Sequence, residues 1–205
     1  MTGIIDYGVG NLFSLRSSFA YIGEETIVSG DADVLNSCER ILLPGVGAFA
    51  DAAQKLRDCG LDKFVRDTAS SGKPLLGICL GMQLLFEKSY EFGEYEGLGL
   101  LGGKIIPIPN ADGKLKIPQI GWNALHFPEN KPKNPLFRDV KPDDCVYFVH
   151  SFYAADCAES VIATTEYGIE LTAAAANGNV MGTQFHPEKS GKVGLSILRA
   201  FCDMR

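Results

Sequence analysis

One cysteine lies between two glycines in a pattern that suits a nucleophile. Cys79 is the centre of Gly77-Ile78-Cys79-Leu80-Gly81, after an apolar run and before a segment with helical character. The glycines leave room for a sharp strand-to-helix turn, which projects the middle side chain away from the backbone. At a helix start, unpaired N–H groups and the helix dipole favour the thiolate, the attacking form of cysteine. We therefore predict that Cys79 is a catalytic nucleophile.

A cysteine between apolar neighbours is otherwise an inert core residue, so Cys79 needs a base within reach. The chain offers three histidines. His186 and Glu188 flank Pro187 at the end of a predicted strand, where strand ends of an α/β sheet converge on the ligand crevice. Because Pro187 restricts the backbone, it keeps the imidazole and the carboxylate close together. The carboxylate can orient the ring and stabilise its cation, so we predict a triad of Cys79, His186 and Glu188.

The other two histidines, His126 and His150, have no partner that the sequence reveals. His150 belongs to an apolar segment that reads as a buried strand, and His126 begins a proline-rich segment. We expect His150 to be a hydrogen-bonded structural residue and His126 to be exposed.

A second glycine-rich turn, Pro44-Gly45-Val46-Gly47, follows another predicted strand and so lies at the same sheet edge as Cys79. Glycines let backbone N–H groups approach a ligand without obstruction. An N–H group of Val46 or Gly47 could therefore join that of Leu80 in an oxyanion hole. The alternative is an ordinary strand-to-helix turn.

These residues require an α/β framework to position them. In the first half of the chain, short apolar runs alternate with helical patterns, which is typical of βαβ units and a parallel sheet. The predicted strands are 3–6, 26–28, 40–43 and 75–78, and the predicted helices are 12–22, 52–69 with a break at Gly60, and 82–87.

After Glu87 the chain becomes rich in glycine turns and β-forming residues, which predicts antiparallel strands. We expect a tight hairpin at Asn177-Gly178, a turn at Asp112-Gly113 and a proline-rich surface loop over 126–142. The predicted strands are 104–108, 114–122, 146–153, 161–165, 170–175 and 179–185, and a final helix carries Val193, Ile197, Ala200 and Phe201 on one face.

The length and the composition favour one globular domain over residues 1–205. The net charge of -6, with no basic run, argues against a nucleic-acid partner. No apolar stretch approaches the roughly 20 residues of a membrane helix. The six cysteines are scattered without a C-x-x-C pair, so we expect no metal site or disulfide framework, and a cytoplasmic protein.

With these residues assembled, the chain resembles the class I (triad) glutamine amidotransferases. The family match rests on Pro44-Gly45-Val46-Gly47, on the Cys79 segment through Gln83, and on Gln184-Phe185-His186-Pro187-Glu188. Within the family, it is similar to the glutaminase subunits of imidazole glycerol phosphate synthases, which serve histidine biosynthesis. That similarity rests on 5–12, Gly121-Trp122-Asn123, 147–151 and Lys189-Ser190.

The resemblance implies a three-layer, flavodoxin-like α/β fold with a mixed, mainly parallel sheet and helices on both faces. It also implies a glutamyl thioester on Cys79, no cofactor, and a heterodimer with a (βα)8-barrel cyclase that consumes the ammonia. By position, Gly45, Gly47, Gln83, Glu91 and Ser151 match glutamine-binding residues, and Asn11, Trp122, Asn123, Tyr147 and Lys189 match the partner-facing side.

Other functions stay open at this point. The residues alone support a cysteine hydrolase or acyl transferase, which includes a stand-alone amidase or peptidase. A glutaminase subunit of another ammonia-using synthase is a further alternative. A non-catalytic interaction module is disfavoured, because Cys79, His186 and Glu188 are all present.

Overall fold

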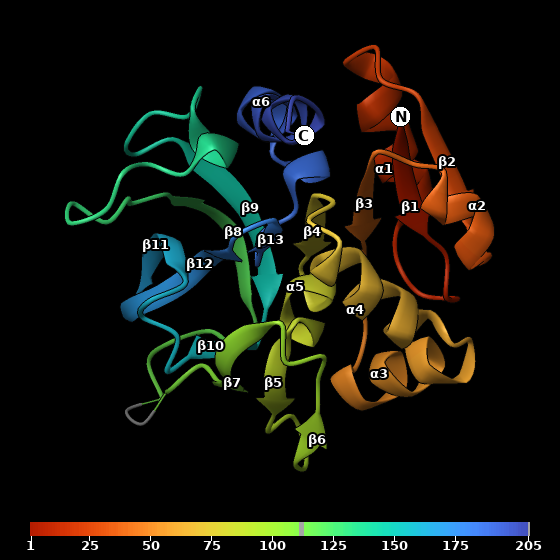
Figure 1. The fold of residues 1–205 in the computed structure, drawn as a ribbon. Helices are drawn as coiled ribbons and strands as arrows, with labels where there is room; N and C mark the ends of the chain where they lie inside the picture. Colours follow the sequence, from red (N-terminus) through yellow and green to blue (C-terminus); the bar gives the residue numbers. More distant parts are fainter. Residues whose placement is uncertain (111–112, 205) are drawn as a thin grey trace.

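The computed structural model describes residues 1–110 and 113–204, and its centre is a seven-stranded sheet (Figure 1). Strands β1 to β4 and β13 run parallel, and β12 and β11 extend the sheet with antiparallel pairing. The order is β11-β12-β13-β4-β3-β1-β2. Their bounds are Thr2–Ile5 (β1), Thr26–Ser29 (β2), Arg40–Leu43 (β3), Leu75–Ile78 (β4), Val161–Tyr167 (β11), Ile169–Asn177 (β12) and Val180–Thr183 (β13).

Helices cover both faces of this sheet, as Figure 1 shows for α6 on one side and α3 to α5 on the other. Alternate strand residues serve the two cores: Ile4 and Leu42 pack with α1 and α6, whereas Ile5 and Ile41 pack with α2 to α5. The helices are Leu12–Tyr21 (α1), Ala32–Asn36 (α2), Phe49–Asp58 (α3), Leu61–Ser70 (α4), Leu80–Leu84 (α5) and Gly191–Cys202 (α6). The α/β class and the mainly parallel sheet are as predicted.

Two smaller sheets complete the second half of the chain. One has the order β10-β7-β5-β6 and packs into the core of α2 to α5, and the other pairs β8 with β9 in the core of α1 and α6. Their bounds are Phe86–Ser89 (β5), Tyr95–Glu96 (β6), Leu101–Pro107 (β7), Gln119–Ala124 (β8), Cys145–His150 (β9) and Phe152–Ala155 (β10). Strands β5 and β7 pair in parallel, so the expectation of antiparallel strands is wrong there.

Several predicted boundaries are wrong for identifiable reasons. The helix expected over 82–87 ends at Leu84, because the short apolar run that follows has no decisive period and enters β5. The strand expected over 114–122 begins only at Gln119, since Pro118 has no N–H group for a ladder. Segment 146–153 divides at Ser151 into strands of different sheets, and β13 ends at Thr183 rather than at Phe185.

Two turn predictions have different outcomes. The hairpin at Asn177-Gly178 is confirmed, because it joins β12 to β13 with Gly178 at φ 58°. In the turn expected at Asp112-Gly113, Asp112 lies outside the described residues, and Gly113 has a φ of 68°.

The proline-rich segment 126–142 is more than the predicted surface loop. A short 3-10 helix, η1 (Pro135–Phe137), is capped by Asn134, whose side chain accepts a bond from the Leu136 N–H group at 2.9 Å. Leu136, Phe137 and Val140 are buried in the core beside α6. Within the described part of the chain, no helix has both the length and the apolar character required to cross a membrane.

Gly81 sets the distance between α5 and β3, and we expect Gly81→Ala to destabilise the fold strongly. A Cβ atom at Gly81 would lie 1.9 Å from the backbone oxygen of Leu43, so α5 would have to move. We expect a loss of about 3 kcal/mol in the free energy of unfolding, measured by urea titration. Gly102→Ala is the matched control, because a Cβ atom there meets nothing within 4 Å; an equal loss in both variants would contradict the packing argument.

Candidate active site around Cys79

Cys79 forms a strained elbow between β4 and α5. Its backbone has φ 55° and ψ -112°, a conformation that a non-glycine residue keeps only when its surroundings impose it. A Cβ atom at Gly77 would come within 2.7 Å of the Gly81 oxygen, so glycine is needed on both sides of the turn. The Cys79 N–H group bonds to the Thr183 oxygen at 2.8 Å, which fixes the elbow against β13.

His186 and Glu188 form a buried pair beyond the end of β13. The ring Nδ1 of His186 lies 2.8 Å from Oε1 of Glu188, and both side chains are almost inaccessible to solvent. The backbone around them is held in place, because the His186 N–H group donates to Tyr147 and the Ser190 hydroxyl donates to the His186 carbonyl at 2.6 Å. Oε2 of Glu188 is buried without a hydrogen-bond partner among the described residues.

The electrostatics of this pair favour a protonated imidazole. Burial alone would lower the pKa of His186, but the proximity of Cys79 and the hydrogen bond to Glu188, with the charges of both groups, raise the pKa of His186 to about 10. An imidazolium beside a cysteine favours attack by the sulfur as a thiolate, so the arrangement suits nucleophilic chemistry at this elbow.

A pocket of about 460 Å³ opens in front of Cys79. His186, Leu80 and the exposed turn of Val46 and Gly47 line one part of it. The other lining residues that the sequence singled out are Gln83, Glu91, His150, Ser151 and Lys189. The structure therefore brings most of the predicted nucleophile, base, oxyanion and substrate residues to one cavity.

The turn from Pro44 to Gly47 is buried and hydrogen-bonded at its start and exposed at its end. The Tyr7 hydroxyl donates to the Pro44 oxygen at 2.8 Å, and burial, with the charge of Cys79, raises the pKa of that phenol. Gly45 is buried: a Cβ atom there would come within 2.7 Å of the Gly81 N atom. Gly45 therefore packs beneath the turn and does not line the pocket, whereas Gly47 is exposed with φ 96°.

Gln83 and Gln184 form a buried amide chain that ends at the nucleophile. Gln83 Nε2 donates to the Phe152 oxygen at 3.1 Å and to Gln184 Oε1 at 3.0 Å. Gln184 Nε2 in turn approaches Cys79 Sγ at 3.9 Å. Gln184 is not among the functional residues predicted from the sequence, in which its place in the segment before His186 is the available signal.

Glu91 bonds to the start of α3. Its Oε2 accepts a bond from the Phe49 N–H group at 2.5 Å. Because Ala48 provides no side-chain cap for α3, Glu91 satisfies one of the free N–H groups of that helix, directly after the Pro44 to Gly47 turn. The positive end of the helix dipole stabilises a carboxylate in this position.

His150 lies in the same pocket but faces other groups. Its Nδ1 lies 2.8 Å from the Phe152 oxygen and its Nε2 2.9 Å from Gln119 Oε1. Burial, and to a smaller extent the charge of His186, lowers the pKa of His150 to about 4, so the ring is neutral at pH 7. His126 is partly exposed and lies 3.7 Å from Asp143.

The residues assigned to the partner side differ in their side-chain contacts. The Trp122 ring meets Tyr147 edge-on with centroids 6.1 Å apart, and Lys189 Nζ lies 5.9 Å from the centre of the Tyr147 ring. Asn11 instead caps α1, with its side chain accepting from the Ser14 N–H group at 3.3 Å. Asn123 bonds to Gln119 and to the Glu166 oxygen.

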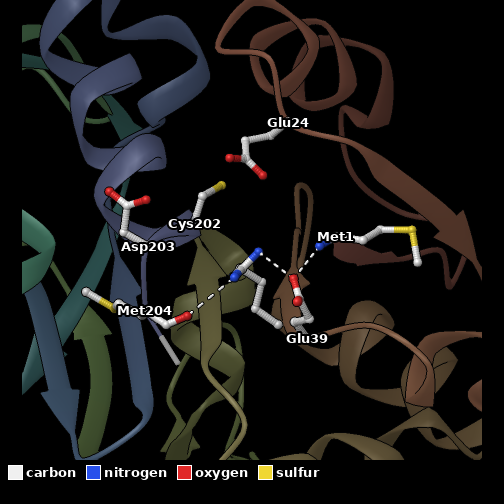
Figure 2. A pocket seen from close by; sticks show the side chains of 7 residues that line it. Met1, Glu24, Glu39, Cys202, Asp203 and Met204 are labelled. Atoms are coloured by element: carbon white, nitrogen blue, oxygen red, sulfur yellow. Dashed lines mark hydrogen bonds and ion pairs between the residues drawn. The ribbon is translucent and has the colours of Figure 1, made fainter.

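A larger cavity, of about 700 Å³, lies at the amino ends of β1 and β3, away from Cys79 (Figure 2). Glu39 there bonds to the Met1 amino group, and burial together with Glu24 raises the pKa of Cys202 to about 11. The Cys202 thiol therefore stays protonated at neutral pH. No histidine among the described residues lines this cavity, so Cys202 lacks the base that nucleophilic chemistry of the Cys79 kind needs. In residues 1–110 and 113–204, no group of three His, Cys, Asp or Glu side chains is placed to hold a metal ion.

Known proteins are similar to this chain over its whole length. The sequence model of the family described as glutamine amidotransferase class-I matches residues 3–204. Imidazole glycerol phosphate synthase subunit HisH of Geobacillus sp. is 48% identical, over 100% of this chain and 97% of that protein. The same subunit of Sulfurimonas denitrificans is 46% identical, over 100% of this chain and 99% of that protein.

Solved structures share the fold. The structure of PurLQS from Thermotoga maritima has a TM-score of 0.77 at 22% identity and covers 98% of this chain and 97% of that chain. A crystal structure of a glutamine amidotransferase has a TM-score of 0.75 at 20% identity, with coverage of 98% and 97%.

Proposed function

This chain belongs to the class-I glutamine amidotransferase family, and we propose that its Cys79 pocket hydrolyses glutamine and supplies the ammonia for imidazole glycerol phosphate synthesis. Its whole-length similarity to HisH subunits makes it a glutaminase subunit of that synthase, in histidine biosynthesis. One observation carries the chemistry: the buried His186–Glu188 pair faces a strained, pocket-lining cysteine.

In the first half of the reaction, the Cys79 thiolate attacks the side-chain carboxamide carbon of glutamine. The carbonyl oxygen becomes an oxyanion, which the N–H groups of Leu80 and of Val46 or Gly47 would stabilise. The His186 imidazolium gives its proton to the leaving nitrogen as the C–N bond breaks, so ammonia departs and a glutamyl thioester stays on Cys79. Glu188 orients the ring throughout.

In the second half, water replaces ammonia in the pocket. Neutral His186 takes a proton from the water, whose oxygen attacks the thioester carbon. The C–S bond breaks, glutamate leaves, and the proton on His186 restores the starting ion pair. Each cycle therefore consumes one glutamine and one water and yields one glutamate, one ammonia and the proton that the new carboxyl group releases.

The pocket offers polar groups for both ends of the substrate. We assign the amino-acid end to Glu91, whose carboxylate attracts the ammonium group, and to Ser151, which also lines the pocket. Gln83 acts indirectly, since its amide is already occupied by Phe152 and Gln184. Gly45 acts by allowing the close packing of the oxyanion turn on α5.

The partner that receives the ammonia is, in this proposal, a (βα)8-barrel cyclase in a cytoplasmic heterodimer. Exposed apolar side chains on β8, Ile120 and Trp122, support a protein interface beside the pocket. All six cysteines are free thiols, which suits a reducing compartment. We assign Trp122, Tyr147, Lys189, Asn11 and Asn123 to this interface.

The experiment is a glutaminase assay of the purified chain, alone and with the (βα)8-barrel cyclase of a HisH-containing synthase. We expect low glutamate production by the chain alone and a marked increase in kcat with the cyclase. Full activity without any partner would support a stand-alone amidase instead. Stimulation only by a synthase of another pathway would refute the assigned partner.

A glutamine analogue that carries an electrophile should label Cys79 and spare the other five cysteines. Only Cys79 combines an imidazole partner with a substrate pocket, whereas burial raises the pKa of Cys157 and of Cys202. Peptide mass spectrometry after brief exposure gives the modified site. If the exposed Cys59 or Cys145 were labelled as fast as Cys79, Cys79 would not be a selective nucleophile. As a control, excess glutamine should slow the labelling of Cys79 and of no other cysteine.

A further inference from the structure

A continuous run of polar side chains joins the outer end of β8 to the Cys79 pocket. Asn123 Nδ2 lies 3.1 Å from the Glu166 oxygen, and Asn123 Oδ1 lies 2.8 Å from Gln119 Nε2. Gln119 Oε1 lies 2.9 Å from His150 Nε2, and His150 Nδ1 lies 2.8 Å from the Phe152 oxygen. Gln119 is fully buried, and it meets His150 because these two residues are direct cross-strand partners in β8 and β9.

This run has four contacts at hydrogen-bond distance but too few hydrogens to make a hydrogen bond at each of them. Both ends are backbone carbonyls, which only accept. Each amide can donate in one direction along the run, and a neutral imidazole can donate through one nitrogen only. Three hydrogens therefore serve four contacts while His150 is neutral, and one contact must join two acceptors.

The position of the missing hydrogen defines two arrangements. With the amides as the structure orients them, His150 carries its proton on Nε2, and the bare Nδ1 faces the Phe152 oxygen. If both amides turn over, the Gln119 amide donates to Nε2 and His150 donates from Nδ1 to Phe152. The mismatch then moves to Asn123 and the Glu166 carbonyl, where Asn123 is partly exposed and a donor from outside can meet both oxygens.

We propose that Gln119 is a positioning residue that sets the tautomer of His150, and that a hydrogen-bond donor arriving at Asn123 reverses it. The inference rests on the proposed function, since the donor would come from the synthase partner that covers β8. In the free chain we expect the Nε2–H tautomer, because the amides as the structure orients them place the Gln119 oxygen on Nε2. With the donor in place, the Nδ1–H tautomer dominates. The contact between two acceptors then lies at Asn123, where the donor from the partner satisfies both oxygens.

The tautomer matters to the reaction because Phe152 is shared. Its carbonyl oxygen accepts a bond from Gln83 and lies 2.8 Å from His150 Nδ1, and Gln83 fixes the Gln184 amide that approaches the Cys79 sulfur. A new donor at this carbonyl competes with Gln83 for the same oxygen and weakens its bond to Gln83. Contact at Asn123 is thereby transmitted to the nucleophile without a movement of the backbone.

Nitrogen NMR of protein labelled with ¹⁵N-histidine tests the tautomer directly, since the chain has three histidines. His150→Asn identifies the His150 signals. We expect the Nε2–H form in the free wild-type chain and the Nδ1–H form in its complex with the cyclase. Gln119→Met removes the acceptor at Nε2, so this variant should show the Nδ1–H form without any partner. Gln54→Met, which removes an exposed bond to Asp58, is the matched control and should leave His150 unchanged.

A second variant keeps a polar group in place if the methionine variant does not fold. A carboxylate in Gln119→Glu only accepts, so both ring nitrogens can donate, and the pKa of His150 should rise by roughly two units. The other titratable side chains that share the pocket with His150 are Cys79, Glu91, His186 and Lys189, and they are the same in both proteins. An unchanged titration of His150 would overturn the role of Gln119.

Kinetics separate this positioning role from the proposed function. In Gln119→Met, the increase in kcat caused by the cyclase should fall by about tenfold, while KM for glutamine stays nearly constant. If the cyclase does not stimulate the wild-type chain, the proposed partner is wrong, and the tautomer of the free chain still tests the relay. An Nδ1–H form in the free wild-type chain, unaltered in Gln119→Met, would overturn the inference.

Discussion

Replacement of Cys79 with serine is expected to lower glutamine hydrolysis by a factor of about 10⁴ or more. The serine hydroxyl keeps the size of the side chain but is not ionised at neutral pH. The electrostatics around His186 favour a charge pair that only a thiolate can form. Single-turnover measurement of glutamate formation gives the effect on chemistry apart from binding.

The same variant separates the two halves of the synthase. Because the ammonia acceptor is used on another chain in our proposal, a complex of Cys79→Ser with the cyclase should still form product from added ammonium salt. Cys59→Ser is the matched control, since Cys59 is exposed outside the pocket, and it should keep full activity. Loss of both glutamine- and ammonia-dependent activity in Cys79→Ser would contradict this division of labour.

The parts of the site that the sequence predicts are those set by local geometry. Glycines at Gly77 and Gly81 indicate a tight elbow whatever the rest of the chain does, and the structure places each against backbone atoms that leave no room for a side chain. His186 and Glu188 are two residues apart, so a short rigid segment is enough to join them. Strand ends at one edge of a parallel sheet then bring these segments together.

The parts that the sequence does not predict depend on long-range contacts. Glu91 reads as a charge at the end of a helix, and only the folded chain brings it to the Phe49 N–H group. The Gln83–Gln184 bond joins residues that are 101 positions apart. Amide side chains give no periodic signal, and their partners are chosen by packing, so the periodicity of the sequence indicates neither Gln119 nor Gln184.

Secondary structure shows the same limit. Residues 82–87 form an apolar run too short for a helix period to be distinguished from a buried strand, and the chain changes from α5 to β5 within it. In 126–142, four prolines predict irregular structure correctly, but they do not show that Leu136 and Phe137 fill the core beside α6. Burial of irregular segments depends on which apolar surface the regular elements leave open.

Removal of the His186 ring is expected to reduce glutaminase activity about as much as loss of the nucleophile, and also to reduce stability. In His186→Ala the ring that accepts and returns the proton is gone, and the buried Glu188 carboxylate loses the cation with which it is paired. An unpaired buried charge costs about 3 kcal/mol or more. Glu188→Gln leaves no such charge, so it should keep the fold and lose less activity.

The pH dependence of stability distinguishes this ion pair from simple packing. The pKa of His186 in the folded chain, about 10, lies above the ordinary histidine value of 6.5, so its stabilisation is fully present below pH 6.5. It is lost as the pH rises through about 10. We expect the difference in unfolding free energy between wild type and His186→Ala to shrink between pH 6.5 and pH 10, as measured by urea titration in steps of pH. A constant difference would show that the ring contributes through packing, and the thiolate–imidazolium pair would have to be abandoned.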